Sequence, residues 1–190
     1  MVRTRWASGS RNCHWLNGGC TVIEDGQPRL LPNGTPEVRA VIFPIEDVEL
    51  VDTWHTMGLA GTGSVDMKAA NVRVPKARSV SLMADKPRAE GALFVFPVFG
   101  LLAMGIAAVA SGNARAALDE FRAFAADART GGARRALAER AAVQQQFAQS
   151  EAEYRAARAM LFGETEAAWD VAQREHRIPI ELRARLRLAA

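Results

Sequence analysis

The chain has 190 residues, of which 49% are hydrophobic and 24% are charged, with a formal net charge of only +3. That length allows one domain or two small ones, and the near balance of charge excludes an extended basic arm for nucleic acid. Cys13 and Cys20 match neither a redox pair nor a zinc motif, and the three histidines are scattered, so no metal is assigned. Two lone thiols without a signal peptide indicate the reducing cytoplasm.

The first part of the chain has the short alternating runs and turn residues that are typical of β-strands. Two strands are expected within Val2–Glu24, one over Val38–Pro44 and one over Val48–Trp54, with glycine, proline and asparagine turns between them. Val65–Val74 also alternates, but some of its apolar residues fall out of step, which indicates a bulge. The pattern predicts an antiparallel sheet or a part of a barrel.

A glycine-rich turn dominates the middle of this region, with the sequence Trp-His-Thr-Met-Gly-Leu-Ala-Gly-Thr-Gly-Ser-Val-Asp over Trp54–Asp66. Its glycines allow main-chain N–H groups to approach a ligand or a neighbouring strand, and Thr62 and Ser64 add short hydroxyls. The turn lacks the Gly-Lys-Ser/Thr ending of a P-loop and does not open a helix as a dinucleotide fingerprint does. From the residues alone, a plain connection is the favoured interpretation.

Beyond a connector over 75–91, the chain becomes helical in pattern. Ala92–Ala110 carries no charge, and its length alone makes it a candidate membrane span. Its proline, glycines and many alanines lower its hydrophobic density, which favours a helix buried in a core or an interface. The continuation is amphipathic, and Gly131-Gly132 is expected to stop it.

Three further helices are expected after this stop. Apolar residues at helical spacing predict one helix from about Arg134 to Leu161. Thr165 is expected to cap a shorter helix through about Glu175, and Pro179 suits the first turn of a fourth segment. The sequence therefore predicts an antiparallel helical bundle.

A cluster of basic residues near the C-terminus is the best candidate for contact with nucleic acid. A solvated helix face is the favoured interpretation of this cluster, so no nucleic-acid partner is expected. Its members are Arg174, His176, Arg177, Arg183, Arg185 and Arg187.

The glycine-rich stretch Trp54–Asp66, followed by Val72–Pro75, resembles the end of the middle β-domain of the acyl-CoA dehydrogenase superfamily. The likeness is greatest to the flavin-dependent monooxygenase (hydroxylase) branch, although Ala60 stands where that family usually has arginine. Upstream, Arg5–Ser10, with His14-Trp15 and Gly18-Gly19 after it, resembles the flavin-edge strand of the family. Downstream, Gly105–Glu120 resembles the first helix of its C-terminal bundle.

This resemblance implies an α+β fold in which a partial middle β-domain, part of a barrel or sandwich, covers residues 1–80. A partial C-terminal helical bundle would cover residues 92–190, so that the chain corresponds to about the middle half of a family member. The implied activity is that of a flavin-dependent oxidoreductase, an oxygen-inserting monooxygenase acting on a small organic molecule. The implied partners are further copies of the chain, a tetramer in the family, and a separate reductase that supplies reduced flavin, as FMN or FAD. No membrane partner is expected.

The resemblance also gives candidate flavin-binding residues at the end of the first strand: Trp6, Ala7, Ser8 and Gly9. Trp6 and the backbone after it would face the flavin ring, and Ser8 is the candidate hydroxyl donor to its N5/O4 edge. A shift of one residue would instead place Ala7 there. Thr62 and Ser64 are further candidates, while ordinary strand residues are the alternative without the family likeness.

No catalytic acid or base is assigned. His55 has a suitable pKa range for such a role, but a surface or hydrogen-bonded histidine is the favoured interpretation. Leu102 and Ala103 occupy the positions where true acyl-CoA dehydrogenases carry a substrate arginine and, in some, the catalytic glutamate. Arg129-Thr-Gly-Gly lacks the phenylalanine of their Arg-x-x-Phe-Gly sequence.

These departures disfavour oxidation of fatty acyl-CoA, and the acid/base is expected in helices outside this chain. An acyl-CoA dehydrogenase proper and a truncated, non-catalytic oligomerisation module remain the alternatives.

Overall fold

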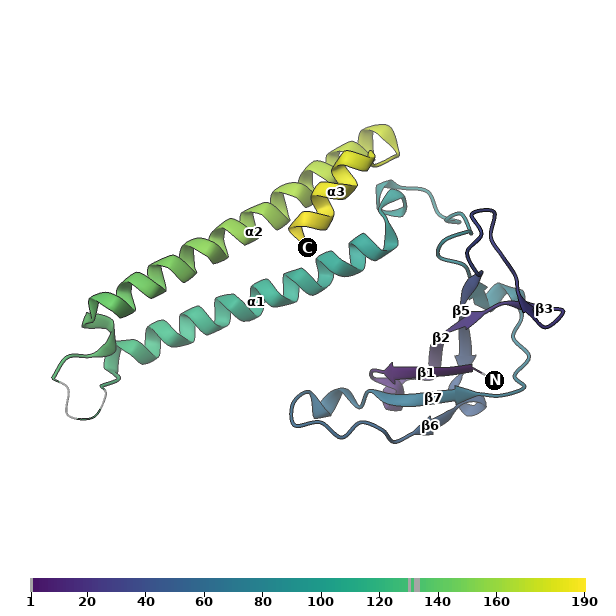
Figure 1. Ribbon diagram of the computed structural model, residues 1–190, viewed down its shortest axis with the longest axis horizontal. Coiled ribbons are helices and arrows are strands. Elements are labelled where there is room, and N and C mark those ends of the chain that lie inside the picture. The colour runs from purple at the N-terminus through teal and green to yellow at the C-terminus, as the bar shows by residue number, and fades with distance from the viewer. Residues whose placement is uncertain (1, 130, 132–133) are drawn as a thin grey trace. The chain divides into compact units, whose positions relative to one another are not determined.

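The computed structural model of the protein describes residues 2–129, 131 and 134–190. The chain forms two compact units, Met1–Lys86 and Pro87–Ala190 (Figure 1). The first unit contains the described strands and the second contains the described α-helices. The fold is therefore α+β, with the two classes of element separated along the sequence.

The strands of the first unit form small antiparallel sheets. Two of these have three strands, in the orders β1-β7-β6 and β2-β5-β8, and β3 pairs with β4 as a short hairpin. Within the described residues these sheets stay open and no closed barrel forms. The bounds are β1 Val2–Ala7, β2 Trp15–Thr21, β3 Ile23–Glu24, β4 Gln27–Pro28, β5 Val38–Pro44, β6 Glu49–Val51, β7 Val65–Ala69 and β8 Ser79–Val80.

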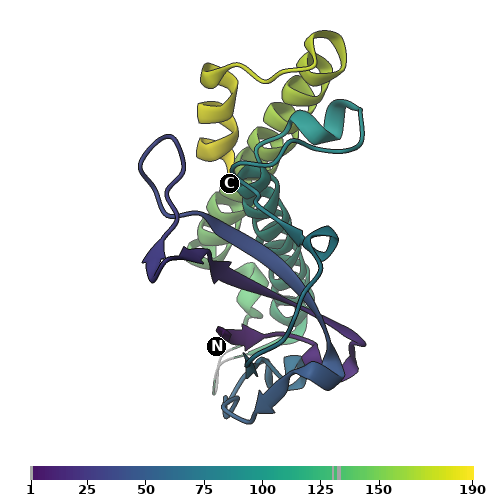
Figure 2. The same cartoon turned by 90° about the vertical axis from the view of Figure 1, so that its right-hand side faces the viewer.

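The two three-stranded sheets pack through a small core that includes Leu16, Phe43, Val65 and Met67, all of which are buried. Figure 2 shows the long β2–β5 pair within this unit. Gly18 of β2 lies at the closest approach, because a Cβ atom there would stand 2.6 Å from Met67 Cε and 3.1 Å from the Thr4 hydroxyl oxygen. A side chain at this position would therefore require the buried end of the Met67 side chain to move.

The expected bulge exists, but it lies on a different strand. β7 ends at Ala69, so Val72 and Val74 fall out of step because they are outside the strand. The register shift is on β1, where Thr4 faces Met67 and Ala7 faces Val65, leaving one extra residue on β1. The strand expected over Val48–Trp54 is also shorter than predicted, because only Glu49–Val51 pair with β7.

The second unit is built on a long hairpin of two antiparallel helices, α1 (Val98–Asp127) and α2 (Ala141–Glu175), with the short α3 (Ile180–Ala189) packed against them (Figure 1). Its core lies where the three helices meet, and Phe96 contacts Trp169 there with ring centroids 6.2 Å apart. Ala168 and Ala172 are fully buried, since small residues let the helices approach closely. The other core residues are Met104, Leu161, Ile178, Leu182 and Leu186.

The predicted break between the helices ending at Leu161 and beginning at Thr165 is wrong. The structure has one continuous helix, α2, through this region. Thr165 does not cap a helix, because its hydroxyl donates to the Leu161 carbonyl one turn earlier at 2.6 Å and contacts the Met104 sulfur at 3.5 Å. A threonine that bonds within its own helix leaves the backbone ladder intact.

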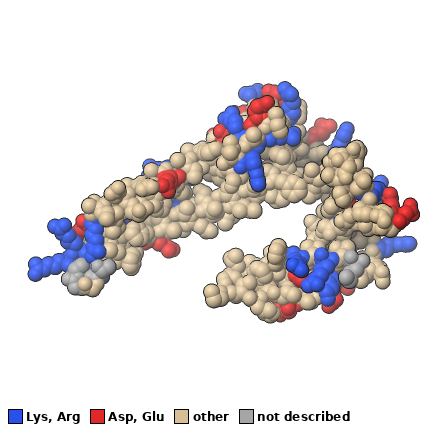
Figure 3. Space-filling view, in the orientation of Figure 1, with Lys and Arg blue, Asp and Glu red and all other residues tan. Residues whose placement is uncertain are grey.

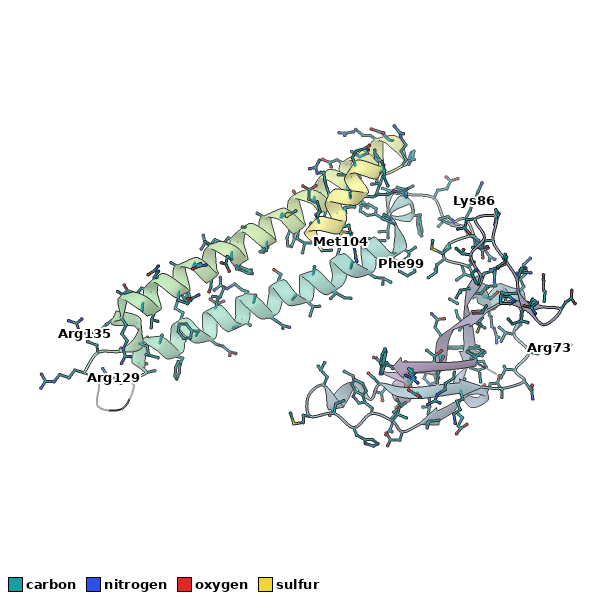
Figure 4. All side chains as sticks on the ribbon, viewed as in Figure 1. Arg73, Lys86, Phe99, Met104, Arg129 and Arg135 are labelled. Carbon is teal, nitrogen blue, oxygen red and sulfur yellow. The ribbon has the colours of Figure 1, made fainter. Side chains whose placement is uncertain are left out.

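The first helix also ends earlier than predicted. α1 stops at Asp127, before the Gly131-Gly132 signal, and Gly132 lies outside the described residues. Arg129 and Arg135 lie in the segment that connects α1 to α2 (Figure 4).

The first half of α1 is apolar on most of its surface. Met104 faces the core and is buried, whereas Phe99 is 61% exposed; both are labelled in Figure 4. Leu102, Ile106 and Val109 are also exposed. By length and composition α1 is apolar enough to cross a membrane, a test that core helices of soluble proteins also pass.

Candidate functional site

The end of β1 is held in an unusual backbone conformation. Trp6 lies in the β1 bulge with a φ of 58°, in the left-handed region, and its side chain is 70% exposed. A non-glycine residue in this conformation costs about 1–2 kcal/mol. Because a strained, exposed aromatic residue is uncommon, this position is a candidate for ligand contact.

The glycine-rich turn packs directly against this strand end. The Gly9 N–H donates to the Thr62 carbonyl at 2.9 Å, which joins the two segments through the backbone. Gly9 itself has a φ of 71°, and Gly63 in the turn has a φ of 51°. These positive values explain why glycine is needed at both positions, since other residues are strained there.

Three hydroxyl groups link the strand to the turn in an unbroken chain. The Ser8 and Ser64 hydroxyl oxygens are 2.8 Å apart, and Ser64 lies 2.7 Å from the Thr62 hydroxyl oxygen. Thr62 in turn donates to the Leu59 carbonyl at 3.0 Å. Ser64 is buried in the middle of the chain, Thr62 is half-buried, and the two end residues, Ser8 and Leu59, are exposed.

The Leu59 carbonyl is the fixed end of this chain. It also accepts the Thr62 N–H and the Trp54 indole N–H, each at 3.1 Å. Leu59 has a φ of 54°, a second non-glycine residue in the left-handed region within this site. The tryptophan that opens the glycine-rich stretch therefore holds the turn in place through its ring nitrogen.

An ion pair between β1 and β7 lies next to the hydroxyl chain. Arg3 on β1 donates to one carboxylate oxygen of Asp66 on β7 through Nε at 3.1 Å and through a terminal nitrogen at 2.7 Å. The Asp66 N–H donates to the Thr53 hydroxyl at 3.1 Å. The pKa of Asp66 is held below its usual range, mainly because its carboxylate accepts hydrogen bonds from the Arg3 guanidinium. This pair joins β1 to β7 beside the hydroxyl chain.

The structure places all four residues of the predicted flavin edge, Trp6, Ala7, Ser8 and Gly9, in this one region. Ala7 is half-buried and faces Val65 across the β1–β7 pair. Next to them, the Ser10 hydroxyl is buried with no partner among the described groups. Ser64 is a weaker candidate from the sequence alone, because nothing in the local pattern shows that it bridges Ser8 and Thr62.

Other candidate residues lie apart from the hydroxyl chain. His55 and His14 are exposed, and Trp15 stacks under the Arg78 guanidinium at 4.5 Å from its ring centre. In the part of the chain that the structure describes, no group of three or more His, Cys, Asp or Glu side chains is arranged to hold a metal.

The helical unit has an uncharged stretch in α1 and an apolar groove between α1 and α2. From Val98 to Ala114, α1 carries no ionisable side chain. A groove between α1 and α2 is lined by apolar residues around the stacked rings of Phe121 and Phe147, whose centroids are 6.2 Å apart.

Further along the hairpin, an ion pair connects α1 to α2. Arg115 donates to Glu151 at 2.8 Å and to Asp119 at 2.9 and 2.8 Å. The Arg115–Glu151 contact holds α1 to α2. We assign these ion pairs a structural role.

The basic cluster near the C-terminus is mixed with acidic side chains (Figure 3). Arg185 pairs with Glu164 at 2.7 Å and Arg177 pairs with Glu175 at 3.1 Å. Pairing neutralises part of the cluster, which accords with a solvated helix face.

Three comparisons relate this arrangement to known proteins. Residues 104–190 match the family model of the acyl-CoA dehydrogenase C-terminal domain. An indole-3-acetate monooxygenase from Pseudomonas putida is 31% identical over 188 residues, which cover 99% of this chain and 46% of that protein. The chain thus spans about half the length of the curated relatives it matches.

The flavin-dependent monooxygenase oxygenase subunit HsaA from Mycobacterium tuberculosis is 32% identical over 88 residues, 46% of this chain and 21% of that protein. A crystal structure of the HsaA monooxygenase from M. tuberculosis matches with a TM-score of 0.77 and 25% identity, covering 98% of this chain and 48% of that one. XiaF from Streptomyces sp., solved with FADH2 and glycerol, has the same fold, with a TM-score of 0.76 and 18% identity over 98% of this chain and 48% of that one. The α+β fold implied by the sequence is therefore confirmed.

Proposed function

Because the chain belongs to the acyl-CoA dehydrogenase superfamily, we propose that the complete protein is a flavin-dependent monooxygenase that inserts oxygen into a small organic molecule. The relatives that match it are named monooxygenases, including an oxygenase subunit. The observation that carries the proposal is the contact between Ser8 and Ser64, which brings the strand end and the glycine-rich turn together at one place.

The donors and acceptors at this place fit the edge of an isoalloxazine ring. The exposed Ser8 hydroxyl is free on its outer side to bond a ring nitrogen or oxygen, and the exposed Trp6 ring offers a flat apolar surface. A flavin edge presents the same combination of a planar apolar ring with hydrogen-bonding nitrogen and oxygen atoms. We therefore assign Trp6, Ala7, Ser8 and Gly9 to the binding of reduced flavin, either FMN or FAD.

Three of these residues would have separate tasks in binding. Ser8 would orient the ring edge, Trp6 would exclude water from one side, and the Gly9 contact with Thr62 would fix the distance between strand and turn. Bound reduced flavin supplies the electrons that activate dioxygen. No acid or base among the described residues of this site is assigned, and we expect that group elsewhere in the complete protein.

The remaining partners follow from the same proposal. A reductase would deliver the reduced flavin, since a relative is named as the oxygenase subunit of a flavin-dependent monooxygenase. Assembly into a homo-oligomer would cover exposed apolar residues of α1, such as Phe99 and Ile106. We place the protein in the cytoplasm, where its two cysteines would stay reduced.

The proposal is tested by titrating the complete protein with reduced FMN and reduced FAD under anaerobic conditions. Binding of one of them, together with oxygen consumption that requires both the protein and a flavin reductase with NADH, is the expected result. Failure to bind either reduced flavin would contradict the proposal.

A matched experiment separates the alternatives. Reduction of a bound oxidised flavin by an acyl-CoA would establish an acyl-CoA dehydrogenase proper. Leu102 and Ala103 argue against this outcome, because neither can bind a charged substrate group or remove a proton. An assembled oligomer that binds no flavin would establish a non-catalytic module.

A further inference from the structure

The sequence contains two asparagine–glycine pairs, Asn17-Gly18 and Asn33-Gly34, which lie in different kinds of structure. In such a pair the backbone nitrogen of the glycine can attack the side-chain amide carbon (Cγ) of the asparagine, because glycine has no side chain to obstruct the approach. The nitrogen loses its proton to a base and bonds Cγ, which closes a succinimide ring while the side-chain nitrogen leaves as ammonia. Water then opens the ring to aspartate or isoaspartate.

Two conditions decide whether such a pair reacts in a folded protein. A base from solvent must reach the glycine N–H, and the backbone must be free to bring that nitrogen to Cγ. A nitrogen buried within a paired strand meets neither condition until the strand opens, which costs more free energy than the opening of an exposed loop. The two pairs of this chain differ on both conditions.

The Asn17-Gly18 pair lies in the middle of β2, where all seven residues pair with β5. Gly18 is buried and faces Val41 in this pairing, although the Asn17 side chain is exposed. The buried end of Met67 lies so close that a Cβ at Gly18 would stand 2.6 Å from its Cε. Solvent is therefore kept from the Gly18 nitrogen, and the paired strand keeps the backbone extended.

The Asn33-Gly34 pair lies in an exposed, tight loop between Leu31 and Thr35. The Leu31 N–H donates to the Thr35 carbonyl and the Gly34 N–H donates to the Leu31 carbonyl, each at 2.8 Å. Gly34 has a φ of 81°, as in loops where a turn is followed by a left-handed glycine, and nothing lies within 4 Å of where its Cβ would stand. Solvent base therefore reaches the Gly34 nitrogen once its exposed bond to Leu31 opens.

The side-chain amide of Asn33 is held in this loop by its oxygen. Asn33 Oδ1 accepts the Thr35 N–H at 3.0 Å and the Thr35 hydroxyl at 2.7 Å. Negative charge develops on this oxygen as the Gly34 nitrogen adds to Cγ, and the two donors are placed to stabilise that charge. Neither bond uses the amide nitrogen, which is the group that departs.

We propose that Asn33 is a site of spontaneous deamidation in the folded protein and that folding protects Asn17. The aspartate product keeps an oxygen acceptor for Thr35, whereas isoaspartate carries the backbone through Cγ and lengthens the loop. Either product adds a negative charge to the loop. This inference goes beyond the proposed function and holds whether or not the protein binds flavin.

The test follows both pairs in the complete protein during incubation in mildly alkaline buffer, below the temperature at which the protein unfolds. Digestion and mass spectrometry of the peptides then give the extent of deamidation at Asn33 and at Asn17. In the folded protein the rate at Asn33 is expected to exceed that at Asn17 by at least about tenfold, which corresponds to about 1.4 kcal/mol in the free energy of local opening.

The same protein unfolded in urea is the matched control. Incubation continues until both pairs have reacted there, at rates that are expected to be similar because the protection by β2 is lost. Asn33→Gln should remove the modification at position 33 and leave the rate at Asn17 unchanged. Equal rates at Asn33 and Asn17 in the folded protein would overturn the proposal, as would an Asn33 that reacts only in urea.

Discussion

The hydroxyl oxygens of Ser8 and Ser64 lie 2.8 Å apart although 56 residues separate them in the chain. This contact joins the end of β1 to the glycine-rich turn before β7. Ser64 is buried and bonded on both sides, to Ser8 and to Thr62, so the turn and the strand end form one hydrogen-bonded unit. Its integrity depends on the sheet beneath it, which gives the first two predictions.

Substitution of Gly18 by valine is expected to destabilise the first unit. A Cβ at Gly18 would stand 2.6 Å from Met67 Cε, and valine would require the end of this buried side chain to move, at a cost of about 1–3 kcal/mol. Gly19→Val is the matched control, because nothing lies within 4 Å of a Cβ at Gly19. Denaturant unfolding measures both, and equal losses at the two positions would contradict the packing argument.

Substitution of Arg3 by methionine is expected to make the first unit more sensitive to acid. The pKa of Asp66 is lowered in the folded protein, so its contribution to stability is present above the ordinary aspartate pKa and is lost as pH falls toward the lowered value. Without Arg3 the folded pKa of Asp66 rises, and the loss begins at higher pH. The midpoint of acid unfolding, followed by circular dichroism, should therefore move upward.

Arg5→Met is the control for this experiment. Arg5 acts on the Asp66 carboxylate only through its charge, as the weakest of the influences on that pKa. Its removal should move the acid midpoint less than Arg3→Met does, and a shift as large as that of Arg3→Met would show that general charge, not the ion pair, is responsible.

Substitution of Arg115 by methionine is expected to lower the melting temperature of the helical unit. Arg115 binds Glu151 on α2 and Asp119 on α1, and its guanidinium lies 5.1 Å from the ring centre of Tyr154. Its removal leaves the carboxylate of Glu151, which is only 19% exposed, with Arg155 as its remaining basic partner. Arg122→Met should have a smaller effect, because Arg122 is 71% exposed and pairs with Asp119 at 3.4 Å.

Trp6 permits a test of backbone strain at the candidate site. In Trp6→Gly the left-handed conformation is no longer strained, whereas Trp6→Val keeps a β-branched residue there. The glycine variant is expected to be more stable than the valine variant by about 1–2 kcal/mol in denaturant unfolding. Both should bind flavin less tightly than the unsubstituted protein, because both lose the exposed ring; unchanged binding in both would remove Trp6 from the site.

The class of the fold was predictable from the sequence. Short alternating runs indicated strands, apolar spacing indicated helices, and three separated motifs indicated one superfamily. A bulge was predictable, but its position was not. The out-of-step valines after β7 resemble a bulge in sequence. The actual bulge, at Arg5 and Trp6, can be recognised only from the register of β1 against β7.

Two features depended on contacts that no local pattern reveals. Thr165 resembles a helix cap in sequence, yet its hydroxyl bonds back to Leu161 and α2 continues through it. Ser64 resembles an ordinary turn residue, and its role as a link appears only when Ser8 and Thr62 are seen on either side of it. Side-chain hydroxyls can satisfy several partners, so their choice is made by the tertiary fold.

The uncharged first half of α1 has a practical consequence for anyone who handles this polypeptide by itself. With Phe99, Leu102 and Ile106 facing water, molecules in concentrated solution will tend to adhere through these side chains. Salting-out agents such as ammonium sulfate strengthen that attraction, whereas mild detergent weakens it. The solubility of the isolated polypeptide is therefore expected to depend on the salt and detergent in the buffer.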